Sequence, residues 1–185
     1  YFLLDESGEV MEPTFCYRDS RNQRGIDRTL DALSWEAIYE ETGIQFVQIN
    51  SLFQMAAEST ERIERMQTFL PLGDGFNYLL CGVAKAEISL ASTTQLYNPR
   101  TGNWADKILD AFNWDHGKFP ELIPSGTLLG RLKPELAVES GLSEIEVIAT
   151  CSHDTGSAVA AVPAEGTDWA YLSSGTWSLI GVELT

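Results

Sequence analysis

Asp154 is the residue of this sequence whose type and surroundings are best suited to chemistry. It follows an apolar run at 146–152 and precedes a stretch of small residues that begins at Gly156. If a strand gives way to a helix here, N–H groups of the first helical turn would point at the carboxylate, favour its ionised form and attract phosphate oxygens. Such an aspartate can take a proton from a hydroxyl group. An aspartate that merely caps the helix fits the local sequence equally well.

The neighbours of Asp154 offer weaker chemistry. His153 could hydrogen-bond a ligand hydroxyl, although a single histidine is more often a structural residue. His116 is the only other histidine, and neither has the partners of a zinc site, so no metal ligands are predicted. Cys151 and His153 share a strand face without an orienting third group, so a cysteine nucleophile is rejected.

A second candidate site is the sequence SSGTW at 173–177. Gly175 permits backbone conformations closed to other residues, and exposed N–H groups with the hydroxyls of Ser174 and Thr176 could hold phosphate. An ordinary tight turn remains the favoured alternative, because turns commonly use Gly and Ser. The chain has no GxxxxGK[ST] motif, and the Gly73 region lacks the third glycine of a dinucleotide fingerprint.

The elements that position these residues are expected to be a mixture of helices and short strands. In the first half of the chain we expect a hairpin over 1–15, a loop over 17–25, a helix over 27–41 ended by Gly43, and a helix that starts at Asn50 or Ser51 and runs to about 69. A short helix at 75–80 and a helix capped by Asn103 follow. The last part is expected to hold a buried strand at 146–152, a helix over 153–163, and a hairpin whose arms are 169–174 and 177–184. The segment 86–98 is ambiguous between helix and strand.

Composition limits the classes of function. A formal charge of −15 over 185 residues makes nucleic acid an unsuitable partner, because phosphate-backbone binding needs a basic face. No apolar run approaches the ~18 residues of a membrane helix, and three widely spaced cysteines are typical of reduced cytoplasmic thiols. Both ends of the sequence fall in or beside apparent strands, so we expect an internal piece of a longer chain.

Five segments, taken in order, resemble the FGGY family of carbohydrate kinases. They are YRDSR (17–21), GIQF (43–46), STTQLYN (92–98), CSHDTGSAVAAVPA (151–164) and WAYLSSGTWSLIG (169–181). The YRDSR and TTQL sequences favour the rhamnulokinase branch over xylulokinase or glycerol kinase relatives. Gly73, where relatives usually carry Pro, and Leu90, where many carry Asn, depart from the family pattern.

The resemblance implies an α/β fold: a ribonuclease H-like, actin-like ATPase domain over 1–166, truncated at its N-terminus, and the first β-hairpin of a second such domain over 167–185. It implies Asp154 as the proton acceptor, His153, Asp154 and Thr155 as sugar contacts, and Thr176 as an ATP contact. The implied cosubstrates are ATP and Mg²⁺, with a small sugar as the partner and the remaining N- and C-terminal portions of the same kinase outside this chain.

The implied reaction is phosphoryl transfer from ATP to the C1 hydroxyl of L-rhamnulose. Half of the nucleotide site would lie outside these residues, so the chain alone is expected to be inactive. Two alternatives stay open: another ketose kinase of the family, such as a xylulokinase or fuculokinase, and a non-catalytic relative that binds a sugar or nucleotide.

Overall fold

Short helices and short strands alternate along the chain in the computed structural model, which describes residues 1–143, 145–166 and 168–183. The elements are β1 (Phe2–Leu4), α1 (Asn22–Ala32), α2 (Trp35–Thr42), α3 (Ser51–Ala56), α4 (Thr60–Arg65), β2 (Thr68–Leu70), α5 (Leu72–Cys81), β3 (Ala86–Glu87), α6 (Ile88–Ala91), β4 (Tyr97–Asn98), β5 (Asn103–Trp104), α7 (Asp106–Ala111), the 3₁₀ turn η1 (His116–Lys118), β6 (Leu122–Ile123), β7 (Leu128–Arg131), α8 (Pro134–Ser140), β8 (Glu146–Ile148), α9 (Asp154–Ala160), β9 (Ala170–Ser174) and β10 (Ser178–Val182). The chain is therefore of the α/β type that the sequence predicts.

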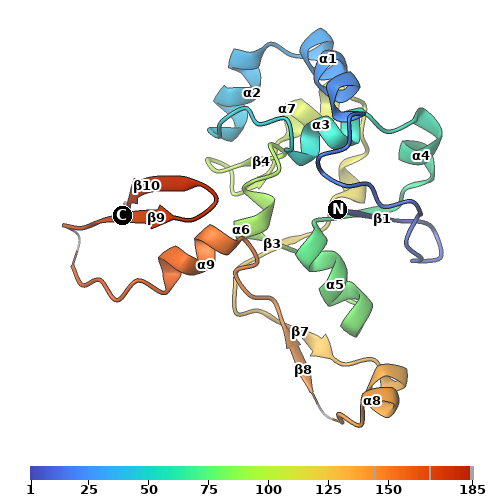
Figure 1. The fold of residues 1–185 in the computed structure, drawn as a ribbon. Coiled ribbons are helices and arrows are strands. Elements are labelled where there is room, and N and C mark those ends of the chain that lie inside the picture. The colour runs from blue at the N-terminus through green and yellow to red at the C-terminus, as the bar shows by residue number, and fades with distance from the viewer. Residues whose placement is uncertain (144, 167, 184–185) are drawn as a thin grey trace.

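The strands pair two by two within the described residues. The pairs β1–β2, β4–β5, β7–β8 and β9–β10 are antiparallel, and β3–β6 is parallel. In Figure 1 the helices α1, α2, α3 and α7 gather at one end of the molecule, the β7–β8 pair projects away from them with α8, and α9 leads to the β9–β10 hairpin at the side.

The core lies among α1, α3, α7 and the β1–β2 pair. Its largest fully buried side chains include Phe53, Phe69 and Ile108. Phe69 packs its ring edge-on against Trp104, with the centroids 5.9 Å apart, and Phe119 lies against both rings. Removing such rings from water supplies most of the stability of a domain, since burying one aromatic side chain is worth roughly 1.5–3 kcal/mol.

The helix expected over 27–41 is wrong in extent and continuity. Helix α1 already begins at Asn22, inside the predicted loop, and the extended backbone of Leu33 ends it. Ser34 then caps a separate helix α2 by accepting a hydrogen bond from the N–H of Ala37. A serine in an apolar-periodic run can therefore start a helix as well as continue one. Gly43, in the left-handed region with φ 67°, ends α2 as predicted.

A single helix from Asn50 to about 69 is also wrong. Helix α3 stops at Ala56, and Ser59 caps α4 through the N–H of Arg62. The remainder, Thr68–Leu70, is the strand β2 that pairs with β1. The expected hairpin over 1–15 forms only in part: the Gly8 turn is present, and one bridge joins Leu4 to Val10, flanked by hydrogen bonds from Asp5 to Glu9 and from Met11 to Leu3. The other edge of β1 pairs with β2.

Two further predictions are wrong. Asn103 lies in β5 and bonds the N–H of Trp104 instead of capping a helix, and α7 begins at Asp106. The run 146–152 forms only the three-residue strand β8, in which Val147 alone is buried, because the β7–β8 pair projects from the core.

The C-terminal elements agree with the prediction. The helix expected over 153–163 is present as α9, and the hairpin forms as β9 and β10, with Ser174 paired to Ser178. The ambiguous segment 86–98 resolves into β3, α6 and β4. Residue 167, at which the second domain was expected to begin, and Leu184, in the second arm of the hairpin, lie outside the described residues.

Candidate active site

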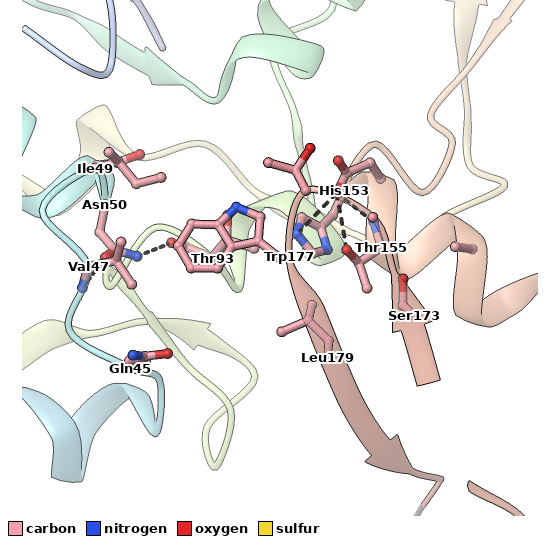
Figure 2. Close-up of a pocket in the computed structure, with 15 residues that line it drawn as sticks. Gln45, Val47, Ile49, Asn50, Thr93, His153, Thr155, Ser173, Trp177 and Leu179 are labelled. Atoms are coloured by element: carbon pink, nitrogen blue, oxygen red, sulfur yellow. Dashed lines mark hydrogen bonds and ion pairs between the residues drawn. The ribbon is translucent and has the colours of Figure 1, made fainter. Parts of the chain in front are cut away.

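A cavity of about 550 Å³ opens where the β9–β10 hairpin faces the body of the chain (Figure 2). One wall comes from the start of α9 and from the hairpin turn, and the other comes from the segment before α3 and from Thr93. The lining residues are Gln45, Val47, Ile49, Asn50, Ser51, Thr93, His153, Asp154, Thr155, Ala158, Ser173, Gly175, Thr176, Trp177 and Leu179. The predicted site residues His153, Asp154, Thr155, Gly175 and Thr176 are among them. Ser174, whose hydroxyl was also expected to hold phosphate, is not in this lining.

His153, not Asp154, caps helix α9. The Nδ1 atom of His153 accepts a hydrogen bond from the N–H of Gly156 at 3.2 Å, and Asp154 is the first residue of the helix. This excludes the interpretation of Asp154 as the N-cap. Because Nδ1 acts as an acceptor, a neutral His153 carries its proton on Nε2, which lies 3.7 Å from Oδ1 of Asp154.

The carboxylate of Asp154 is open to the cavity, with 96% of the side chain exposed. Its Oδ1 atom accepts hydrogen bonds from the N–H of Thr155 at 2.6 Å and from the hydroxyl of Thr155 at 3.3 Å. These two bonds fix the orientation of Oδ1. The exposed carboxyl group is therefore available to a ligand that enters the cavity.

The hairpin turn presents an open backbone to the same cavity. A Cβ atom built on Gly175 would meet nothing within 4 Å, and the N–H of Gly175 bonds the carbonyl of Trp177 across the turn. Figure 2 shows the indole of Trp177, which is 59% exposed, reaching from the hairpin toward Asn50 and Thr93. The sequence identified the turn but gave no reason to assign a role to Trp177.

The facing wall is held by the side chain of Asn50. Its Oδ1 accepts from the N–H of Val47 at 2.9 Å, and its Nδ2 donates to the carbonyl of Thr93 at 2.7 Å. The sequence predicted that a helix starts at Asn50 or Ser51; Asn50 is the N-cap residue of α3, but its side chain makes no cap hydrogen bond. A buried amide that joins two loops fixes their spacing, and only the tertiary structure reveals this role.

A second cavity of about 490 Å³ shares Ser51 and Thr93 with the first. Tyr17, from the YRDSR segment, and Leu90 also line it. Arg21 of the same segment binds the buried carboxylate of Glu58 at 3.0 Å and stacks over the ring of Phe15. The YRDSR loop is thereby fixed beside the candidate site.

Cys151 does not face the candidate site. Its Sγ lies beside Gly156, where an added Cβ atom would come within 2.9 Å of the sulfur, and Cys151 lines a separate surface cavity on the other side of α9. The three cysteines are free thiols, as the expectation of reduced cysteines requires.

A buried acidic pair, Asp74 and Glu87, lies beside the segment that leads into α9, and the sequence analysis did not predict it. Glu87 and Asp74 are each 1% exposed, and Oδ1 of Asp74 accepts from the N–H of Glu87 at 3.0 Å. Burial raises the pKa of Asp74 to about 7, and the neighbouring Glu87 carboxylate adds to the rise. Burial acts in the same direction on Glu87, but hydrogen bonds from Ser125, Ser89 and Ser152 outweigh it and hold the pKa of Glu87 below its usual range.

The donors at the first cavity suit a phosphate-bearing ligand. The exposed hydroxyl of Thr176 can donate to phosphate oxygens, and no side chain at Gly175 blocks their approach to the turn. Among the described residues, no group of three or more His, Cys, Asp or Glu side chains could hold a metal ion. A Mg²⁺ ion that binds mainly through substrate phosphates requires at most one or two protein carboxylates, so this donor set is compatible with it.

The described residues also contain no helix long and apolar enough to cross a membrane.

Comparison with protein families places these features in a known class. Residues 1–161 match the model of the N-terminal domain of the FGGY family of carbohydrate kinases. The match covers well over half of the chain, so the chain belongs to this family.

The chain is similar in sequence to bacterial rhamnulokinases. It is 40% identical over 185 residues to the rhamnulokinase of Enterococcus faecalis, covering 100% of this chain and 37% of that protein. It is 41% identical over 183 residues to the rhamnulokinase of Bacillus subtilis, covering 99% of this chain and 38% of that protein. The chain thus spans less than two-fifths of the length of these curated relatives.

Solved structures agree on the fold. A carbohydrate kinase from Novosphingobium aromaticivorans superposes with a TM-score of 0.81 at 22% identity, over 97% of this chain and 39% of that one. Ligand-bound xylulose kinase from Lactobacillus acidophilus gives a TM-score of 0.79 at 18% identity, over 97% of this chain and 37% of that one. The fold is therefore that of the sugar kinases of this family.

Proposed function

We propose that this chain is part of an ATP-dependent sugar kinase that phosphorylates the C1 hydroxyl of L-rhamnulose, with Asp154 as the general base. One observation carries the proposal: the exposed Asp154 carboxylate and the open turn at Gly175 line the same cavity. A base for the hydroxyl and a surface for phosphate are the two protein parts that phosphoryl transfer requires.

In this proposal Asp154 accepts the proton of the sugar hydroxyl as that oxygen bonds to phosphorus. Oδ1 of Asp154 is engaged by Thr155, and within the described part of the chain Oδ2 forms no hydrogen bond, so Oδ2 is the oxygen that receives the proton. His153 would hydrogen-bond a sugar hydroxyl through its Nε2 proton, and Thr155 would contact the sugar from the same helical turn.

The hairpin would hold the nucleotide. The hydroxyl of Thr176 would donate to an ATP phosphate, and the lack of a side chain at Gly175 would let phosphate oxygens approach the backbone. Mg²⁺ bound to the ATP phosphates would supply charge neutralisation during transfer. Trp177, which projects across the cavity, would separate the reacting groups from bulk water.

The domain division rests on the same reasoning. We propose that residues 1–166 form most of a ribonuclease H-like, sugar-binding domain, and that 167–185 begin the ATP-binding domain of a longer protein. Two observations support this division: the family match ends at residue 161, and the chain covers only 37–38% of the rhamnulokinases that it resembles. Residues 1–185 alone are accordingly proposed to be inactive.

L-Rhamnulose is the proposed sugar because the relatives of about 40% identity are rhamnulokinases. The second candidate is D-xylulose, which the structural likeness to a xylulose kinase brings into consideration. Coupled assays of ATP consumption by the full-length protein with L-rhamnulose, D-xylulose and L-fuculose separate these possibilities. The highest kcat/KM is expected with L-rhamnulose. A higher kcat/KM with another ketose would mean that this ketose, and not L-rhamnulose, is the substrate. No turnover with any sugar would favour a non-catalytic binding protein.

A further inference from the structure

Glu87 is a buried carboxylate that the proposed reaction does not use. It ends β3 and is 1% exposed, yet its pKa lies below the usual range, so the ionised form is the one that its surroundings favour. A buried charge persists only where hydrogen bonds compensate for lost hydration. The donors that compensate Glu87 therefore indicate which parts of the molecule this residue connects.

One set of donors surrounds the start of α6. Oε1 of Glu87 accepts from the N–H of Ser89 at 3.0 Å, and Oε2 accepts from the hydroxyl of Ser89 and, at 3.4 Å, from the N–H of Leu90. On the opposite side the hydroxyl of Ser125 donates to Oε1 at 2.6 Å. These contacts are local or lie within the β3–β6 region, and the bond from Ser125 involves no residue of the segment before α9.

A second set of donors comes from the segment that leads into α9. The N–H and the hydroxyl of Ser152 both lie 3.4 Å from Oε2 of Glu87. The next residue, His153, donates its N–H to the hydroxyl of Ser89 at 3.3 Å. Two consecutive backbone N–H groups immediately before Asp154 are thus bound to Glu87 or to the serine that Glu87 holds.

Ser152 is confined from the other side by α5. A Cβ atom built on Gly73 would come within 3.0 Å of Cβ and 3.2 Å of Oγ of Ser152, so the glycine backbone lies directly against this serine. Asp74, the next residue, binds the N–H of Glu87 at 3.0 Å and ties α5 to the same strand. The β8–α9 junction is therefore clamped between the starts of α5 and α6.

We propose that Glu87 is a positioning residue for catalysis, which acts through Ser152 and His153 to fix the point where α9 begins and hence the place of the Asp154 carboxylate in the cavity. This inference rests on the proposed role of Asp154. Since displacement of a reacting group by about 1 Å can cost roughly 100-fold in rate, such an anchor matters to catalysis without touching the substrate.

The test compares two serines that bind the same carboxylate. In the full-length protein, Ser152→Ala removes the hydroxyl donor on the α9 side of Glu87, and Ser125→Ala, the matched control, removes the donor on the other side. Ser152→Ala is expected to lower kcat about tenfold, with the KM values for sugar and ATP within about twofold of the parent. Ser125→Ala is expected to keep the parent kcat.

Glu87→Gln completes a double-mutant cycle. It is expected to lower kcat at least as much as Ser152→Ala. The kcat of the double variant is expected to equal that of Glu87→Gln alone, because both changes break the same contact between Glu87 and Ser152. The inference is overturned if Ser152→Ala keeps the parent kcat, if Ser125→Ala lowers kcat equally, or if the two effects multiply. If Glu87→Gln does not fold, the comparison of kcat between Ser152→Ala and Ser125→Ala alone tests the inference.

Asp154→Asn, assayed alongside, separates this inference from the proposed function. Loss of turnover in Asp154→Asn with full kcat in Ser152→Ala contradicts only the positioning role of Glu87. Unchanged turnover in Asp154→Asn contradicts the proposed base, and the positioning inference falls with it.

Discussion

At the scale of single residues, His153 and Thr155 determine how Asp154 is presented at the start of α9. His153 satisfies the N–H of Gly156 and leaves Asp154 free of the capping role, while Thr155 holds one oxygen of the carboxylate. The side chain that remains is 96% exposed within the cavity. An oriented and accessible carboxyl group is what a general base needs.

Asp154→Asn in the full-length protein is therefore expected to lower kcat by about 100-fold or more, because an amide cannot accept the hydroxyl proton. Asp31→Asn, on the exposed surface of α1, is the matched control and should keep the parent rate. Steady-state kinetics with L-rhamnulose and ATP provide the measurement. A kcat within a factor of two of the parent would remove Asp154 from the mechanism.

Thr176→Val is expected to raise the KM for ATP about fivefold, the equivalent of one hydrogen bond of about 1 kcal/mol, while the KM for the sugar stays constant. Thr176→Ser retains the hydroxyl and should restore the parent value. The KM for each substrate, measured at saturation of the other, tests this assignment. An increase confined to the KM for the sugar would indicate that Thr176 contacts the sugar and not ATP.

At the scale of elements, close backbone contact decides where α1 lies on α3. A Cβ atom on Gly25 would come within 1.7 Å of the carbonyl oxygen of Phe53, so only glycine fits at this crossing. Gly25→Ala is expected to destabilise the protein by about 1–3 kcal/mol, since the helices must separate. Asp31→Ala, in the same helix, controls for the change in helix propensity.

Urea denaturation of the two variants and the parent measures this difference. The midpoint should fall clearly for Gly25→Ala and stay near the parent value for Asp31→Ala. Equal midpoints for all three proteins would mean that α1 can move away from α3 without loss.

At the scale of the whole molecule, the Asp74–Glu87 pair makes stability depend on pH. The folded-state pKa of Asp74, about 7, lies above its ordinary value of 3.8, so the folded protein holds this proton more tightly than the unfolded chain. Stability due to Asp74 is therefore lost as pH rises from about 4 to 7. The lowered pKa of Glu87 acts oppositely, since its contribution is lost only as pH falls below about 4.5.

Asp74→Asn is expected to raise the unfolding temperature at pH 8 relative to the parent and to flatten the pH dependence between 5 and 8. The amide oxygen can still accept from the N–H of Glu87, and no buried charge has to form beside the Glu87 carboxylate. Thermal unfolding at pH 5, 6.5 and 8 tests this expectation. A variant less stable than the parent at pH 8 would contradict it.

Local signals in the sequence were sufficient for several elements and for the parts of the site. The small residues after Asp154 predicted α9, Gly43 marked the end of α2, and the apolar arms around Gly175 predicted the β9–β10 hairpin. Each of these depends on interactions between residues close in the sequence, such as caps and turns. For the same reason the segments at 151–164 and 169–181 carried enough information to identify the family.

Only the tertiary structure decided which distant residues meet. No signal in the sequence indicated the pairing of β1 with β2 or the contact between Asn50 and Thr93 on the facing wall. Glu87 belonged to an ambiguous segment, and its bond to Ser152 spans 65 residues. Burial and hydrogen bonding between remote segments depend on how the whole chain packs, so a single sequence determines the parts of this site while the fold determines their arrangement.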